Sequence, residues 1–322
     1  MTQFHVFVGI DVSKDYLDIA LLSSEKRTSK SFRIANLRER IDDFISELKV
    51  NPDQVLFCLE HTGRYGSAFL EAASDQGLHV RVEHPLQLKR SLGMVRGKTD
   101  ALDALRIAEY ACRFADKAVP WKAEAAVLAQ LRKLQSKRSL LVKAQKQLKQ
   151  AVEGRTDTDF EAPMQAIKEA ITAIEQKMVA LIKSDQKPNS QYELLRSVPG
   201  VGAVSAVMLL VTTQGFTRLT APKKLACYAG IAPFPYRSGS SIRRGDRVSK
   251  FGNKELKVLL NLAAWNAIRS VSALKNYFDR KVAEGKHKLS VINAVRNKLV
   301  AIILSVIRPN TPFVKKYNPQ KA

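Results

Sequence analysis

The amino-acid sequence predicts an α/β domain at the N-terminus, then a helical spacer, then a mainly helical C-terminal domain. Over the first third of the chain, short β-branched apolar runs alternate with amphipathic helical stretches, which is the pattern of an α/β domain. A long region of helical periodicity without strand signals follows, and further apolar helices fill the rest. The 322 residues suffice for two or three domains with substantial cores.

The predicted N-terminal elements occur in a characteristic order. Asn36 and Thr99 are the expected N-caps of two helices, because their side chains can accept a hydrogen bond from the first turn. The elements are three strands, a helix, a strand, a helix, a strand and a helix, at residues 5–10, 16–22, 31–34, 36–49, 54–59, 65–76, 78–82 and 99–114. This order is that of a ribonuclease-H-like α/β fold.

Four acidic residues lie where such a sheet would hold a site. Asp11 and Glu60 follow the carboxyl ends of two predicted strands, and Asp100 and Asp103 share one face of a predicted helix. Magnesium prefers carboxylate oxygens, and a pair of metal ions needs an acid cluster of this sort. The alternative is a solvated helix start, where acids are common. The four positions together favour a magnesium site.

The opening strand, turn and strand also occur in sugar kinases and actin-like ATPases. Those proteins place glycine in the turn after the aspartate, so that backbone N–H groups can hold phosphate. The turn here is Val12-Ser13-Lys14, without glycine. This difference disfavours a kinase.

Two helical stretches form the predicted spacer. In the first, 123–152, leucines recur every seven residues and basic residues are abundant. In the second, 164–181, apolar residues alternate spacings of three and four. The pattern predicts a helical hairpin, a dimerising coiled coil or an intramolecular core seam. The basic face could follow phosphates or be a solvated surface. Pro188 and Asn189 are expected to mark the next boundary.

Residues 194–202 contain a Pro-Gly-x-Gly turn between two helical patterns. Such a turn is typical of helix-hairpin-helix motifs, in which backbone N–H groups contact phosphate without reading bases. A plain turn between helices explains the same residues equally well.

A serine-rich loop at 229–245 is the second candidate site. Its prolines, glycines and serines argue against regular structure at its centre. A serine among guanidinium groups suits attack on a phosphodiester, although a loop that only grips phosphate fits as well. Helices are predicted at 250–272 and 290–306. The candidate nucleic-acid contacts are Arg237, Arg243, Arg244, Arg247, Lys250 and Lys254.

Composition restricts the partners. The net charge is +23, and the segment from Arg243 to the end has 18 Lys and Arg against 4 Asp and Glu. This excess predicts a polyanion, with nucleic acid ahead of an anionic membrane surface. No apolar run approaches the roughly 20 residues of a spanning helix, and no signal peptide is evident, so a cytoplasmic, nucleoid-associated location is expected. The three scattered cysteines predict reduced thiols, and the five histidines show no zinc spacing.

These features together resemble one family. The acid set Asp11, Glu60, Asp100 and Asp103, the helical spacer, Ser238-Gly239 and the run Ser249-Lys250-Phe251-Gly252-Asn253 look like the DEDD transposases of insertion sequences. Relatives of these enzymes are the Piv-type DNA invertases and the bridge-RNA-guided recombinases of bacteria and archaea. The resemblance covers nearly the whole chain.

The resemblance implies three domains and a division of labour between them. A RuvC-like domain, 1–119, would bind magnesium through the four acids; a coiled-coil spacer, 120–188, would follow. A transposase domain, 189–322, would supply a serine that attacks DNA and forms a phosphoserine link. By position this serine is Ser238, with Ser240 and Ser241 as neighbouring candidates. The resemblance also implies oligomers, a site composed from two subunits, and a noncoding bridge RNA beside donor and target DNA.

The leading hypothesis is therefore a magnesium-dependent, serine-using DNA recombinase of an insertion element. One alternative is a junction-resolving nuclease in which water attacks and the serine loop only grips DNA. The other is a non-catalytic nucleic-acid-binding protein. A covalent protein–DNA adduct separates the first two, and metal dependence separates the third.

Overall fold

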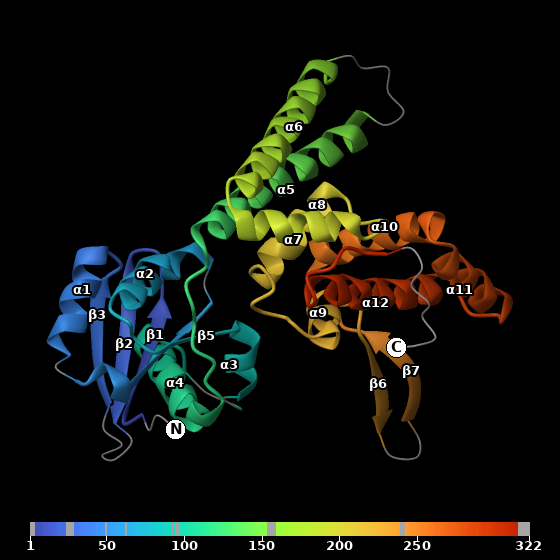
Figure 1. Cartoon of the computed structure of the whole chain (residues 1–322). Helices are drawn as coiled ribbons and strands as arrows, with labels where there is room; N and C mark the ends of the chain where they lie inside the picture. Colours follow the sequence, from blue (N-terminus) through green and yellow to red (C-terminus); the bar gives the residue numbers. More distant parts are fainter. Residues whose placement is uncertain are drawn as a thin grey trace. The chain divides into compact units, whose positions relative to one another are not determined.

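The computed structural model describes residues 4–23, 29–48, 50–61, 63–91, 93, 97–152, 159–238 and 242–314. Figure 1 shows the arrangement of helices and strands along the chain. Contacts between residues divide the chain into two compact units, Met1–Ala123 and Glu124–Ala322. The division of the chain into three domains at 119 and 188 stays a prediction.

The first unit contains a five-stranded mixed sheet in the order β3-β2-β1-β4-β5. β1 is antiparallel to β2 and parallel to β4, β2 is antiparallel to β3, and β4 is parallel to β5. The strands are β1 Val6–Val12, β2 Tyr16–Ser23, β3 Ser29–Ala35, β4 Val55–Glu60 and β5 Val80–Glu83. An antiparallel hairpin beside parallel strands is the ribonuclease-H-like arrangement, so the predicted fold class is confirmed.

Helices cover both faces of this sheet. α1 (Arg38–Glu47) and α2 (Ser67–Asp75) pack on the face to which Val8, Ile10 and Phe57 contribute. On the other face, α4 (Asp100–Arg113) packs against the residues that alternate with these. α3 (Pro85–Ser91) precedes α4, and short 3₁₀ helices lie at Pro52–Gln54, Gly63–Gly66 and Ala115–Lys117.

The two predicted N-caps have different outcomes. Thr99 caps α4 as expected, since its hydroxyl accepts a hydrogen bond of 3.2 Å from the N–H of Leu102. Asn36 does not cap α1, whose N-cap is Leu37 without a side-chain bond. The Asn36 amide instead donates to the carbonyl oxygens of Ser13 and Tyr65, at 2.9 and 3.0 Å. The Asn36 side chain thus links the turn between β1 and β2 to the segment before α2 instead of capping α1.

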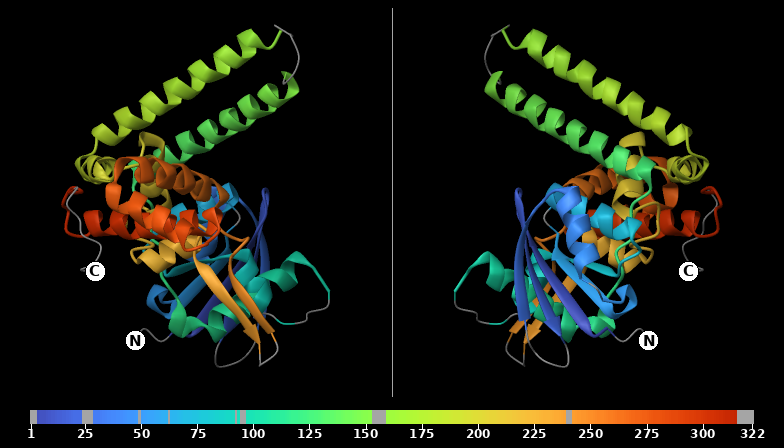
Figure 2. Two further views of the ribbon diagram at one scale, coloured as in Figure 1. Left: turned by 90° about the vertical axis from the view of Figure 1, so that its right-hand side faces the viewer. Right: turned by 90° about the vertical axis from the view of Figure 1, so that its left-hand side faces the viewer.

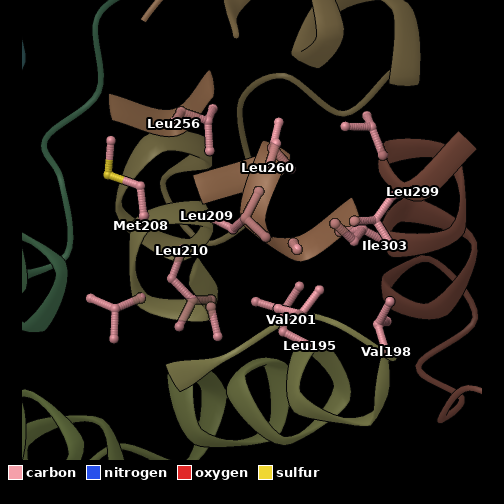
Figure 3. Packing of buried hydrophobic residues seen from close by; sticks show 14 of the residues in the cluster. Leu195, Val198, Val201, Met208, Leu209, Leu210, Leu256, Leu260, Leu299 and Ile303 are labelled. Atoms are coloured by element: carbon pink, nitrogen blue, oxygen red, sulfur yellow. The ribbon is translucent and has the colours of Figure 1, made fainter. Parts of the chain in front are cut away.

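The second unit is mainly helical. α5 and α6 run side by side as a long antiparallel hairpin, which Figure 2 shows from two sides. Its other helices contribute to a large apolar core, part of which Figure 3 draws, and the base of the hairpin adds Leu131 and Ile182 to this core. The helices are α5 Ala126–Val152, α6 Glu161–Lys183, α7 Gln186–Ser197, α8 Ala203–Thr213, α9 Pro222–Tyr228, α10 Lys254–Ser270, α11 Ser272–Ala283 and α12 Lys288–Ile307, and the strands are β6 Pro233–Ser238 and β7 Ile242–Val248.

Pro188 and Asn189, the expected boundary, lie in the first turn of α7, which Asp185 caps and where proline needs no N–H partner. The domain boundary at 188 itself stays a prediction. The second difference from expectation concerns the serine loop. Most of the serine loop is regular, since residues 233–238 and 242–248 form an antiparallel hairpin. Proline is tolerated there because a two-stranded sheet leaves an edge on each strand.

α12 is long and apolar enough to cross a membrane by length and composition. Arg296 and Lys298 interrupt its apolar run, so no continuous spanning segment is evident in the sequence. Val295, Leu299 and Ile303 on this helix are fully or almost fully buried in the protein. Burial of this face accounts for its apolar composition as a core helix.

Candidate active site

The four predicted acids converge on one face of the sheet. Residues on a strand alternate between faces, so Asp11 shares the face of Phe7 and Gly9, and Glu60 shares the face of Leu56 and Cys58. This is the face that α4 covers. β1 and β4 are parallel and in register up to Ile10 and Leu59, so Asp11 and Glu60 follow at neighbouring strand ends. Asp100 and Asp103 occupy the first turn of α4.

A contact between backbones holds α4 against β1. A Cβ atom on Gly9 would lie 2.1 Å from the carbonyl oxygen of Ala104 and 2.2 Å from the amide nitrogen of Ala108. Ala104 and Ala108 are themselves completely buried. Glycine within a strand often marks such an approach of another backbone. This contact sets the separation between Asp11, two residues after Gly9, and Asp103, one residue before Ala104.

Replacing Gly9 with alanine is expected to destabilise the first unit and to impair the acid cluster. The added methyl group meets only backbone atoms of α4, so the helix has to move. Overpacking of this kind costs about 1–3 kcal/mol or more in the free energy of unfolding. Urea unfolding measures this cost. Gly202→Ala is the control, because its nearest neighbour is a side-chain atom 3.9 Å away, and an equal loss in both variants would contradict the prediction.

Repulsion from neighbouring carboxylates is visible in the pKa values of Asp11 and Glu60. Burial and the negative charges of Asp103, Asp100, Glu60 and Asp18 raise the pKa of Asp11 from 3.8 to about 6. Burial and the charge of Asp103 also raise the pKa of Glu60. The neighbouring carboxylates therefore make the charged forms of Asp11 and Glu60 less favourable. A cation placed between them would relieve this repulsion.

Two arginines contact the acids of α4. Arg33 on β3 donates two hydrogen bonds, of 2.9 and 3.0 Å, to the nearly buried Asp18, and a third of 2.7 Å to Asp100. Arg106 donates to Asp103 at 2.8 Å. Neither these two arginines nor Asp18 was among the site residues predicted from the sequence. The register of the predicted strands could have indicated Asp18 and Arg33, because Asp18 pairs with Asp11 on one side and with Arg33 on the other.

The donor chemistry of this site suits magnesium, since four carboxylates supply hard oxygen ligands. Within the described parts of the chain, no three Asp, Glu, His or Cys side chains are arranged closely enough to hold a metal ion. The ion pairs of Asp100 with Arg33 and of Asp103 with Arg106 are consistent with this. Binding of a cation by all four acids would require these two carboxylates to leave their arginines.

A second polar network fixes the other end of α4. Arg81 donates to Glu83 and to the carbonyl oxygen of Phe114, both at 2.7 Å, and Tyr110 donates to Glu83 at 2.8 Å. Burial acts to raise the pKa of Glu83, but the His84 N–H, Tyr110 and Arg81 lower it overall. Glu83 is the register partner of Glu60, yet these donors occupy its oxygens. We therefore exclude it from the candidate ligands.

The candidate nucleophile lies in the second unit. Ser238 is the last residue of β6 and pairs with Ile242 of β7. The side chains of Ser238, Arg237, Arg243 and Arg244 lie outside the described part of the structure, as do Ser240 and Ser241 entirely. Arg247, Lys250 and Lys254 are exposed beside the hairpin.

Two family models match the chain, one before and one after α6. A DEDD transposase model of the IS110 type matches residues 8–155, and a model described as "Transposase IS116/IS110/IS902 family" matches residues 192–279. Together they cover well over half of the sequence. The chain belongs to the IS110 family of transposases. It is therefore an enzyme of DNA recombination.

The relatives of this transposase include a gene-inverting protein and a protein of an insertion element. The "Pilin gene-inverting protein" of Moraxella bovis is 27% identical over 96% of this chain and 98% of its own length. The "Insertion element IS110 uncharacterized 43.6 kDa protein" of Streptomyces coelicolor is 32% identical over 45% of this chain and 35% of its own. Thermus thermophilus RuvC, solved with a Holliday junction substrate, aligns with 36% of this chain and 99% of its own, at 16% identity and a TM-score of 0.30.

The candidate residues of the transposase divide between the two matched segments. All four acids lie in the first segment. Ser238 and the six candidate basic residues lie in the second. The two parts of the proposed site thus belong to different compact units of the chain.

Proposed function

We propose that this transposase cuts and rejoins DNA with a magnesium site at Asp11, Glu60, Asp100 and Asp103 and with Ser238 as the nucleophile. The observation that carries the proposal is the arrangement of four carboxylates where the ends of β1 and β4 meet the first turn of α4, with the pKa of Asp11 raised to about 6 by burial and by the other acids. Carboxylates held close together although their repulsion disfavours ionisation are typical of sites that bind a cation or transfer a proton.

The acids would act as ligands. Bound magnesium would supply positive charge to phosphoryl oxygens and to the attacking oxygen. Asp11 and Glu60 come from strand ends and are held by the sheet, whereas Asp100 and Asp103 are positioned by the Gly9 contact. Rigid elements of this kind hold reacting groups more precisely than loops do.

Ser238 would form the covalent link to DNA. Its Oγ attacks the phosphorus, a new Oγ–P bond forms, and the bond from phosphorus to one deoxyribose oxygen breaks. The proton of the hydroxyl ends on the departing sugar oxygen. Attack by a sugar hydroxyl on the phosphoserine reverses these changes and rejoins the strand. A serine hydroxyl needs activation at neutral pH, for which the acid site is the proposed source.

The proposed partners are donor and target DNA, with a noncoding bridge RNA by resemblance to the family, and further copies of the chain. The net charge of +23 supports a polyanionic partner. The name of the Moraxella relative supports site-to-site DNA inversion as the class of reaction.

A denaturing gel of the protein with labelled junction DNA tests the proposal. We expect a covalent protein–DNA band in magnesium and none in the presence of a chelator. Cleavage without such a band would instead support a nuclease in which water attacks. Binding without any cleavage, under every divalent metal tried, would support a non-catalytic nucleic-acid-binding protein.

Binding to duplex DNA is expected to weaken steeply with salt. A protein that neutralises about six phosphates loses on the order of 10³-fold in affinity between 50 and 200 mM salt. Alanine at Arg247, Lys250 or Lys254 should lower the slope of log affinity against log salt by about 1 each if the residue contacts phosphate. Fluorescence anisotropy measures the slope, and Arg40→Ala, on α1, is the control. A slope near zero for the wild-type protein would contradict a phosphate interface.

A further inference from the structure

The β6–β7 hairpin that carries Ser238 depends on its root for its orientation. Its described side chains, at 233–235 and 247–248, are exposed, so they add no buried core. The last fully buried residue before β6 is Ile231. A two-stranded hairpin is only marginally stable in isolation. The contacts around Ile231 therefore determine the direction in which the hairpin projects from the helices of its unit (Figure 1).

At this root, the segment before β6 meets the segment after β7. A Cβ on Gly252 would lie 2.2 Å from the Cα of Gly230, and a Cβ on Gly230 would lie 2.9 Å from the Cα of Gly252. Gly230 has a positive φ of 67°, which glycine adopts without strain. The N–H of Asn253 donates to the carbonyl oxygen of Tyr228 at 2.8 Å. Both ends of the hairpin are thus fastened to each other.

α12 holds the same root from a third direction. The amide groups of Asn293 and Asn297, one helical turn apart, both donate to the carbonyl oxygen of Ile231, at 2.9 and 3.0 Å. Asn297 also donates to the carbonyl oxygen of Asn293 at 2.8 Å. The Oδ1 atom of Asn293 is buried and has no hydrogen-bond partner among the described residues.

We propose that Asn293 and Asn297 are positioning residues for strand cleavage. By holding the carbonyl oxygen of Ile231, they fix the root of the hairpin and thus the place that Ser238 occupies. This role rests on the proposed function of Ser238. The run from Ser249 to Asn253 belongs to the same root. Gly252 makes the close contact with Gly230, and Asn253 caps α10 by accepting a hydrogen bond of 2.9 Å from the N–H of Leu256.

Hydrogen exchange on the full-length protein tests the positioning role without relying on chemistry. The variants are Asn293→Ala, Asn297→Ala and their double, with Asn266→Ala, an exposed asparagine on α10, as the control. Each single variant leaves Ile231 one donor, whereas the double leaves none. We expect amide exchange at 230–235 and 247–253 to rise by at least about tenfold in the double and far less in the singles. Exchange elsewhere in α7, α8 and α10 should be unchanged.

The rate of adduct formation at saturating DNA is the second measurement. For the double variant we expect a fall of about ten- to a hundredfold with DNA affinity unchanged, because misplacement of a reacting group acts on the chemical step. Its effect should exceed the product of the single effects. A folded double variant with wild-type exchange at the root, or with a wild-type adduct rate, would overturn the inference. If the wild-type protein forms no adduct, the serine mechanism is wrong and the positioning role falls with it, whereas the exchange data still decide whether the two asparagines hold the root of the hairpin.

Discussion

Replacing Asp11 with asparagine is expected to abolish strand cleavage while leaving DNA binding intact. The substitution keeps the shape of the side chain but removes one of the four proposed magnesium ligands. Metal ions contribute several kcal/mol to the stabilisation of transition-state charge, so the cleavage rate should fall by at least about 10³-fold. Asparagine at Glu60, Asp100 or Asp103 is expected to act in the same direction. Single-turnover cleavage in magnesium measures the effect.

The same Asp11 variant should be more stable than the wild-type protein. The pKa of Asp11 is raised in the folded state, so its ionised form opposes folding at neutral pH. Removing that charge should therefore raise the midpoint of thermal unfolding in metal-free buffer. Asp43→Asn is the matched control, because Asp43 is exposed on α1, which packs on the other face of the sheet. Full cleavage by the Asp11 variant would remove the basis for the metal site.

Replacing Ser238 with alanine is expected to eliminate the covalent adduct completely. Without its hydroxyl, position 238 cannot form the bond to phosphorus, whereas binding of DNA by neighbouring basic residues persists. A denaturing gel of labelled DNA detects the adduct. Ser240→Ala and Ser241→Ala are the matched controls on the same loop. An adduct that survives in Ser238→Ala and disappears in one of these two would move the nucleophile to that serine.

Mixing the Ser238→Ala and Asp11→Asn proteins tests whether one site draws on two subunits. The acids lie in the first compact unit and Ser238 in the second, so a pair of chains can combine an intact acid set with an intact serine. We expect each variant to be inactive alone and the mixture to regain part of the adduct. Recovery requires exchange of subunits, which refolding the two proteins together ensures. No recovery under that condition would assign both groups to a single chain.

Much of the first unit could be predicted from local patterns. Short apolar runs predicted the two strands at whose ends Asp11 and Glu60 lie, and Thr99 caps the helix that carries Asp100 and Asp103 as predicted. These features are set by residues near each other in sequence or by the period of a strand. The four acids could therefore be selected as candidates without knowledge of long-range contacts.

Features that depend on distant contacts could not be predicted in the same way. Arg33 reaches Asp100 across 67 positions of sequence, and Asn36 reaches Tyr65 across 29. The strands β6 and β7 were missed because Pro233 and Pro235 suggest irregular structure, although both suit an edge strand. The close approach of Gly230 to Gly252 is equally invisible without the fold, since neither glycine differs locally from one in a loop.

The contact between Gly9 and α4 has a genetic consequence. The atoms that a Cβ at position 9 would meet are the backbone of residues 104 and 108, which no substitution on α4 can make smaller. A copy of this gene that loses glycine at codon 9 thus has no suppressor available at codons 104 or 108. In a selection for restored recombination, revertants of such a copy should regain glycine at codon 9 itself. Recovery of such a copy therefore depends on a change at that one codon.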